Sequence, residues 1–162
     1  MRIPALLLTA ATFLALPACT PPVDLSKGLQ VEVISSGWFN AGIENGKNKL
    51  VPSISFTLKN VSDRNLVMLQ INAVFRRMTD KDEGELGRGF VIAAGPSGLA
   101  PGVSSRVFTV RSEFGYLGTE PRLQILQNTQ FIDGKVALSG KYGALPWKPL
   151  GEYPIMRRLI AQ

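Results

Sequence analysis

Few side chains in this 162-residue chain are suited to catalysis. The sequence has no histidine and only one cysteine, Cys19. Without an imidazole, a protein lacks Ser-His and Cys-His nucleophile pairs, a base that titrates near neutral pH, and the usual ligands of a zinc site. The sequence therefore predicts a protein that is not an enzyme and that uses no cofactor and no transition metal.

Four of the twelve acidic residues form the only carboxylate cluster of the sequence, in the short segment Asp80–Glu85. Hard cations such as calcium bind several carboxylate oxygens from a single loop. Lys81 interrupts this segment, however, and the distal glutamate of a full calcium loop is missing. Two interpretations stay open: a cation site, or a solvated loop tip that its like charges keep extended.

The cysteine ends an N-terminal leader. A positive Met1-Arg2 precedes an apolar stretch, Ala5–Leu16, which is too short to span a bilayer as a permanent helix. The stretch ends in Leu16-Pro17-Ala18-Cys19, which resembles the lipobox of bacterial lipoproteins. The resemblance implies a signal peptide over residues 1–18 and a diacylglyceryl group on the Cys19 sulfur. The alternative is an ordinary secretory leader that is cut after Ala18 and leaves no lipid.

A lipidated Cys19 would attach the protein to a membrane. Two or more acyl chains anchor a protein stably, whereas one chain does so only marginally. Residues 19–27 are then a lipidated tether, stiffened by Pro21 and Pro22. Thr20 stands where an inner-membrane retention signal would carry aspartate. By resemblance to Gram-negative lipoproteins, the protein is expected in the cell envelope, on the outer membrane and facing the periplasm.

The rest of the chain alternates between apolar and polar residues, which is typical of half-buried strands. In Pro52–Asn60, Ile54, Phe56 and Leu58 share one face, and a similar pattern runs from Leu69 to Phe75. About seven or eight such strands are separated by turn residues. We therefore expect one all-β domain over residues 28–162, an immunoglobulin-like antiparallel β-sandwich.

The second half of the chain carries more specific expectations. Val103–Ser112 is predicted to be one strand. Leu123–Ile132 and Lys135–Ser139 flank Asp133-Gly134, a dipeptide typical of two-residue hairpins, and are predicted to be paired strands. Trp147–Gln162 is predicted to be either an edge strand or a docked tail.

Part of the chain resembles a known family of bacterial immunoglobulin-like domains, the FxLYD type. The resemblance covers roughly residues 50–112 and depends on Lys59-Asn60-Val61-Ser62, the strand that follows to Phe75, and Leu99–Gly102 leading into Val107-Phe108. Val74-Phe75-Arg76 stands where that family has Leu-Tyr-Asp. The resemblance implies a β-sandwich fold and brings no catalytic residues.

The mature domain is basic, because removal of Arg2 with the leader changes the formal charge only from +6 to +5. Beyond residue 134, five cationic residues face a single acidic one, Glu152, and aromatic residues lie between them. Aromatic and arginine side chains are favoured anchors of interfaces. The alternative is that Trp147 and Tyr153 only seal one edge of the sandwich. The predicted binding residues are Tyr142, Trp147, Tyr153, Arg157 and Arg158.

Together these features predict a non-enzymatic, lipid-anchored protein that binds a protein partner as an accessory subunit of an envelope assembly. The alternative is a binder of anionic envelope polymer or lipid through the basic C-terminal third, since a basic surface attracts such groups. No nucleic-acid ligand is expected, because the leader exports the protein away from it.

Overall fold

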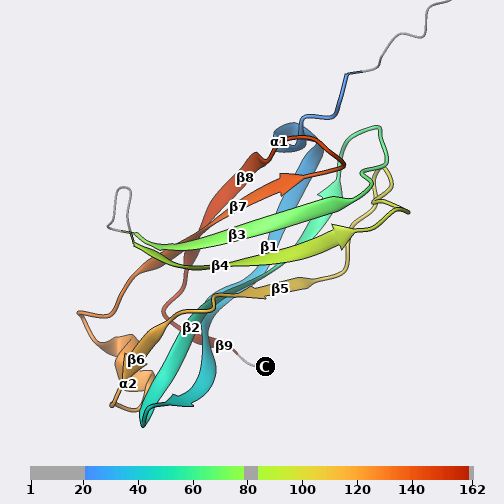
Figure 1. Cartoon of the computed structure of the whole chain (residues 1–162). Helices are drawn as coiled ribbons and strands as arrows, with labels where there is room; N and C mark the ends of the chain where they lie inside the picture. The colour runs from blue at the N-terminus through green and yellow to red at the C-terminus, as the bar shows by residue number, and fades with distance from the viewer. Residues whose placement is uncertain (1–20, 79–83, 161–162) are drawn as a thin grey trace, which may run out of the picture.

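The protein is an all-β immunoglobulin-like sandwich of two facing sheets, as predicted (Figure 1). The computed structural model describes residues 21–78 and 84–160. Short helices lie at opposite ends of the molecule, α1 (Leu25–Gly28) and α2 (Arg122–Gln127). The strands of the described residues are β1 (Leu29–Glu44), β2 (Lys47–Asn60), β3 (Leu69–Arg77), β4 (Glu85–Ala94), β5 (Phe108–Arg111), β6 (Tyr116–Gly118), β7 (Gly134–Lys141), β8 (Lys148–Ile155) and β9 (Leu159–Ile160).

The two sheets divide the strands as an immunoglobulin-like sandwich does. The first sheet has the order β5-β2-β1-β9, and β6 also pairs with β2. The second sheet has the order β4-β3-β7-β8. Neighbouring strands are antiparallel, except that β9 runs parallel to β1. The chain therefore crosses between the sheets four times, after β2, after β4, between β6 and β7, and after β8.

The alternating residues of β2 and β3 build the core, as the sequence predicts. Ile54, Phe56 and Leu58 of β2 have no exposed surface, while Lys59 between two buried residues is exposed. The same holds for β3, where every second residue from Leu69 to Phe75 is fully buried. One apolar face per strand thus fixes which side of each sheet turns inward.

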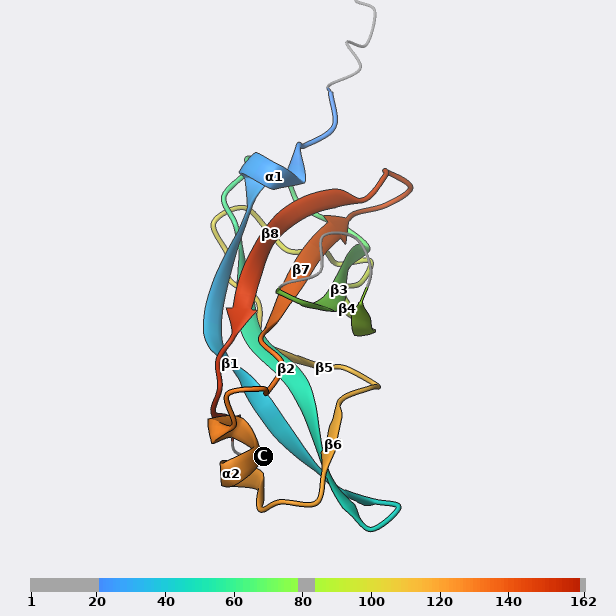
Figure 2. The same cartoon turned by 90° about the vertical axis from the view of Figure 1, so that its left-hand side faces the viewer.

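The β1–β2 hairpin is longer than the second sheet. It closes through Asn45-Gly46, which both have positive φ (51° and 75°), the conformation of a tight hairpin turn. Its far end is covered by β6, by α2 and by the segment that follows α2 (Figures 1 and 2). There the Phe131 ring lies 4.6 Å from the Trp38 ring and 5.1 Å from the Tyr116 ring, measured between centroids.

The predicted hairpin around Asp133-Gly134 is wrong. Arg122–Gln127 forms α2, and residues 128–133 are turns before β7 begins at Gly134. Ile125, Leu126 and Phe131 are buried over the end of the β1–β2 hairpin. The apolar residues of this segment therefore cover the hairpin instead of forming a strand. A short apolar run does not by itself distinguish a buried helix from a buried strand.

Three other boundaries differ from the sequence expectations. Val103–Ser112 is a strand only over Phe108–Arg111. The C-terminal segment contains both predicted alternatives, since β8 is the edge of the second sheet and β9 docks beside β1. Leu25, within the predicted tether, is only 1% exposed and packs in the core, so the folded body begins before residue 28.

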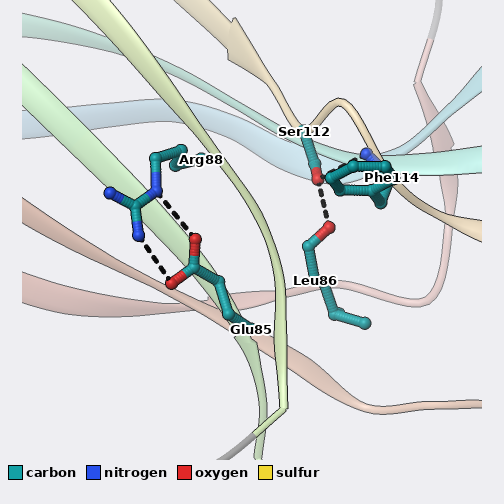
Figure 3. Close-up of polar contacts among 5 residues, drawn as sticks. All are labelled: Glu85, Leu86, Arg88, Ser112 and Phe114. Carbon is teal, nitrogen blue, oxygen red and sulfur yellow. Dashed lines mark hydrogen bonds and ion pairs between the residues drawn. The ribbon is translucent and has the colours of Figure 1, made fainter.

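The seam between β4 and β5 closes one side of the sandwich. The Ser112 hydroxyl donates to the Leu86 carbonyl at 2.7 Å and accepts from the Phe114 amide at 3.2 Å (Figure 3). Gly87 and Gly89 of β4 have no side chains at this crossing, where a Cβ would lie 2.3 Å from the Ser112 hydroxyl and 2.2 Å from Val110 respectively. Small residues therefore let the edges of the two sheets touch.

Within the described residues, none of the helices has the length and hydrophobicity needed to cross a bilayer. Over the same residues, no three Asp, Glu, His or Cys side chains gather where they could hold a metal ion. Cys19 and Asp80, Asp82 and Glu83 of the acidic segment lie outside the described residues.

Candidate functional site

The five residues predicted to bind a partner do not form one patch. Tyr142 and Trp147 lie in the connection between β7 and β8, near α1, and Tyr153 lies within β8. Arg157 and Arg158 follow β8, towards the end of the molecule that α2 occupies. Two of the basic residues in the C-terminal third are also engaged in ion pairs within the protein. Lys135 pairs with Glu152 at 2.8 Å, and Arg157 pairs with Asp133 at 2.6 Å.

Both tyrosines pack against the core. The Tyr142 hydroxyl accepts a hydrogen bond of 2.5 Å from the Val23 amide, so it fastens the start of the folded body. Tyr153 is half-buried, and desolvation by burial raises the pKa of its hydroxyl. These contacts give the two residues a structural role in the free protein.

Arg157 holds the segment after α2 in place. Its guanidinium donates to the Asp133 carboxylate at 2.6 Å, to the Asn128 carbonyl at 2.9 Å and to the Phe131 carbonyl at 2.7 Å. A planar fork of donors suits such a set of oxygens, which are spread along one turn. The same hydrogen bond and charge hold the pKa of Asp133 below its ordinary value.

Trp147 is the predicted aromatic residue that stays available. It is 41% exposed, and its ring centroid lies 6.4 Å from that of Phe90 on β4. The Lys141 ammonium lies 5.1 Å from the centre of the Trp147 ring, a cation–π contact. Trp147 therefore reaches over the solvent side of the second sheet, across β7 and β3 to β4.

We name this solvent side of the β4-β3-β7-β8 sheet the contact face. Phe90 and Ile92 of β4 point outward and are 53% and 61% exposed. They pair in register with Asn72 and Gln70 of β3, whose polar side chains face the same way. An aromatic pair and an aliphatic side chain thus lie together on a sheet face that no element of the described residues covers.

Charged residues lie beside these apolar residues, with Lys141 next to Trp147 and the others towards the Glu85 end of the sheet. Among the described residues, the contact face carries four cationic side chains, on β3, β4 and β7, and two acidic ones, on β4 and β8. Arg88 forms a two-pronged ion pair with Glu85, which lowers the pKa of that carboxyl (Figure 3). The face keeps an excess of positive charge. The charged residues are Arg76, Arg88, Lys135, Lys141, Glu85 and Glu152.

No family model matches the chain, and no curated protein matches it. Among solved structures, it is similar to a protein described as the X-ray structure of Northeast Structural Genomics Consortium target SoR45. The likeness covers 82% of this chain and 89% of that chain, at 11% sequence identity and a TM-score of 0.48. The function must therefore be argued from the residues of the chain.

Sequence reasoning identified Trp147 but missed its partners Phe90 and Ile92. The signal was present, because both residues alternate with Val91 within the apolar run Gly89–Ala94. In a strand, every second side chain points to the same face, so Phe90 and Ile92 share a face with the charged Arg88. Two large apolar residues on the face of a charged residue indicate an apolar patch on the solvent side. Phe90 and Ile92 lie near Trp147 because of the order of the strands in the sheet, and this order cannot be read from the sequence.

The Arg157–Asp133 pair predicts a pH-dependent contribution to stability. Since the Asp133 pKa is lower in the folded than in the unfolded protein, the pair stabilises the fold above the unfolded value of about 3.9 and loses this effect as pH falls through the folded value. We expect Arg157→Ala to return the Asp133 pKa towards its ordinary range, measured by carboxyl carbon NMR. Thermal unfolding of the variant should differ most from wild type near neutral pH.

Arg157→Lys is the matched control, because it keeps the charge but loses the fork. It should restore part of the Asp133 pKa shift without restoring both carbonyl contacts. An Asp133 pKa that is unchanged in Arg157→Ala would contradict the conclusion that Arg157 lowers this pKa.

Proposed function

We propose that the protein is a lipid-anchored, periplasm-facing β-sandwich that binds a protein partner as a non-enzymatic accessory subunit of an envelope assembly. The observation that carries the binding role is the exposed Phe90–Trp147 pair, with Ile92 beside it. Large apolar side chains that remain in water together are typical of binding surfaces. The lipobox-like leader ending in Cys19 supports the anchored location.

The residue types favour a protein partner. Tryptophan and arginine are enriched among the residues that contribute most to protein–protein affinity, usually at the centre of a patch with a polar rim. On the contact face, Trp147, Phe90 and Ile92 form the apolar part, polar residues of β3 and Lys141 adjoin it, and the other charged residues lie towards the Glu85 end. Its excess positive charge is complementary to an acidic rim. The expected partner therefore presents apolar side chains surrounded by Asp or Glu.

The chain also orients the domain relative to an anchor. The described chain begins beside α1, and α2 lies at the opposite end (Figures 1 and 2). Cys19 is two positions before Pro21, and an extended residue spans at most about 3.6 Å. A lipid on Cys19 would hold the α1 end towards the membrane, with the contact face beside it.

Photocrosslinking in intact cells tests this function. We expect a photoreactive amino acid at position 92 of the full chain to give one discrete adduct, and Trp147→Ala to reduce that adduct about tenfold or more. The adduct is measured by immunoblot and its peptides by mass spectrometry. The intact mass of the same preparation reports the acyl chains on Cys19.

Phe114 supplies the matched control position, since it is exposed and lies at the seam beside Leu86 and Gly87, several positions along β4 from Ile92. The same photoreactive group there should not give the adduct. Adducts that are equal at positions 92 and 114, or that persist in Trp147→Ala, would reject the contact face. A free Cys19 thiol in the natural product would reject the anchored location.

A further inference from the structure

The first sheet has its own surface depression, on the side facing away from the core. Its volume is about 570 Å³, within the range of small-ligand sites, although it is open to solvent. It crosses four strands, from β5 through β2 and β1 to β9. We name it the arginine groove. Its lining residues are Ile34, Ser35, Ser55, Thr109, Arg111, Arg158, Leu159 and Ile160.

The lining is positive and rich in hydrogen-bond donors. It contains two arginines and three hydroxyl groups but no acidic residue. The register explains this grouping, because Ser35 pairs with Ser55, and Ser55 pairs with Thr109. Three hydroxyl side chains therefore form a row across β1, β2 and β5, with the arginines beside them.

Both arginines are held by contacts that leave donors free. The Arg111 guanidinium carbon lies 3.5 Å from the centre of the Phe39 ring, which contacts the face of the guanidinium. Arg158 donates from Nε to the Ser36 carbonyl at 3.0 Å. Among the described residues, neither the Arg111 guanidinium nor the Arg158 terminal nitrogens have a hydrogen-bond or ion-pair partner. Restrained side chains with unused donors lose little entropy when they bind.

The hydroxyl pair adds a further donor. The Ser55 and Thr109 hydroxyl oxygens lie 2.8 Å apart, so one of them donates to the other. Each hydroxyl has one hydrogen, and the accepting group keeps its own for another partner. That hydrogen can point to a ligand in the groove. With Ser35 and two guanidiniums, the donors outnumber the two oxygens of a carboxylate and suit the several oxygens of a phosphate.

We propose that the arginine groove binds a phosphate group, with Arg111 and Arg158 as its cationic ligands and Ser35, Ser55 and Thr109 as hydroxyl donors. The site lies on the opposite sheet from the contact face and goes beyond the proposed function. Ile34, Leu159 and Ile160 give the groove an apolar wall, which suits a phosphate that belongs to an organic molecule. The phosphate source is either a lipid or polymer phosphodiester or the free ion.

NMR titration of the purified full chain tests the site. The probes are inorganic phosphate, a soluble short-chain phosphatidylglycerol and acetate, at constant ionic strength. We expect the Thr109 amide and the Arg111 side-chain signals to shift with a phosphate probe and not with acetate. Tighter binding of the phosphodiester identifies a lipid or polymer source, and tighter binding of inorganic phosphate identifies the free ion.

Arg111→Gln should weaken binding about tenfold or more, because it removes charge-assisted hydrogen bonds. Arg106→Gln is the matched control: Arg106 precedes the same strand and lies over Phe108, outside the groove lining. It should change the affinity less than about twofold. Thr109→Val, which keeps the side-chain volume, should also weaken binding.

Three results would overturn the proposal: no shift with either phosphate probe, equal binding of acetate, or an equal effect of the two arginine variants. The last result would indicate only general attraction to a basic surface. Trp147→Ala should leave phosphate binding unchanged. The phosphate-site proposal and the proposal of a protein-binding contact face are therefore tested by different variants, and either can be rejected without the other.

Discussion

Asn60→Ala should cost about 2–4 kcal/mol of folding free energy, because it leaves several buried polar groups without partners. The Asn60 side chain is fully buried. Its amide donates to the Arg64 carbonyl at 2.6 Å and to the Leu99 carbonyl at 2.7 Å. Its oxygen accepts from the Ser62 amide at 3.0 Å and from the Ser62 hydroxyl at 2.6 Å. One side chain thus satisfies two loops that are far apart in sequence.

The backbone of Asn60 strengthens the same junction. Its amide donates to the Val103 carbonyl at 3.0 Å, and its carbonyl accepts from the Gly102 amide at 2.7 Å. Alanine would keep these bonds but remove the four side-chain bonds. The free energy of unfolding, from urea denaturation of wild type and variant, measures the loss.

Two variants separate the buried network from a general effect of losing an asparagine. Asn65→Ala removes one exposed bond to the Ser97 carbonyl, and we expect a loss of about 1 kcal/mol or less. Asn60→Asp places a carboxylate against two carbonyl oxygens, so its carboxyl pKa should rise in the folded state. That variant should then lose stability as pH rises through the unfolded value of about 3.9 and regain it below. Equal losses in Asn60→Ala and Asn65→Ala would contradict the network.

The composition of residues 60–65 is typical of a turn, but it does not reveal this network. Asn, Ser and Asp cluster there, and their short polar side chains favour turns. That one of them is buried depends on Leu99, which lies 39 positions further along the chain. Local patterns report the turn, whereas the burial of its asparagine follows from how distant loops meet.

The strands were predictable to the extent that one face of each is buried. β2 from Ile54 onward and β3 from Leu69 to Phe75 alternate between buried and less buried residues, and the sequence pattern predicted these stretches. Leu123–Ile132 has no such constraint, because it covers the end of a hairpin instead of filling a sheet. Its helix is six residues long, too short for helical periodicity to be distinguished from alternation.

The candidate surfaces were less predictable than the strands. Arginine donates equally well to a partner or to its own chain, so Arg157 was as good a binding candidate by sequence as Arg158. The fold uses Arg157 on three oxygens of its own chain and leaves Arg158 beside Arg111, which β5 supplies. Phe90 and Trp147 likewise meet only because β4 and the β7–β8 connection share one sheet.

Gly87→Ala should also destabilise the fold by about 2–5 kcal/mol, through two separate effects. Gly87 has a φ of 132°, which an L-residue adopts only with strain. An added Cβ would also lie 2.3 Å from the Ser112 hydroxyl oxygen, which itself bonds Leu86 and Phe114. The clash would push apart the β4–β5 seam shown in Figure 3.

Two other glycines allow the effects to be measured separately. Gly102 has a φ of 74° and open space around its Cα, so Gly102→Ala reports backbone strain alone, about 1–2 kcal/mol. Gly95 also has open space and lies outside the positive-φ set, so Gly95→Ala should change stability by about 0.5 kcal/mol or less. Urea unfolding of all three variants should rank Gly87→Ala well above Gly102→Ala, and Gly95→Ala near zero.

A double-mutant cycle decides whether the Ser112 hydroxyl is the group that an added Cβ would hit. Ser112→Ala alone should cost about 1–3 kcal/mol, because the Leu86 carbonyl and the Phe114 amide lose their partner. In the double variant the oxygen is absent, so the clash disappears while the strain remains. The double variant should therefore lose less stability than the two single losses added together. Additive losses would mean that the alanine is accommodated without touching Ser112, and that the seam is not closed by this contact.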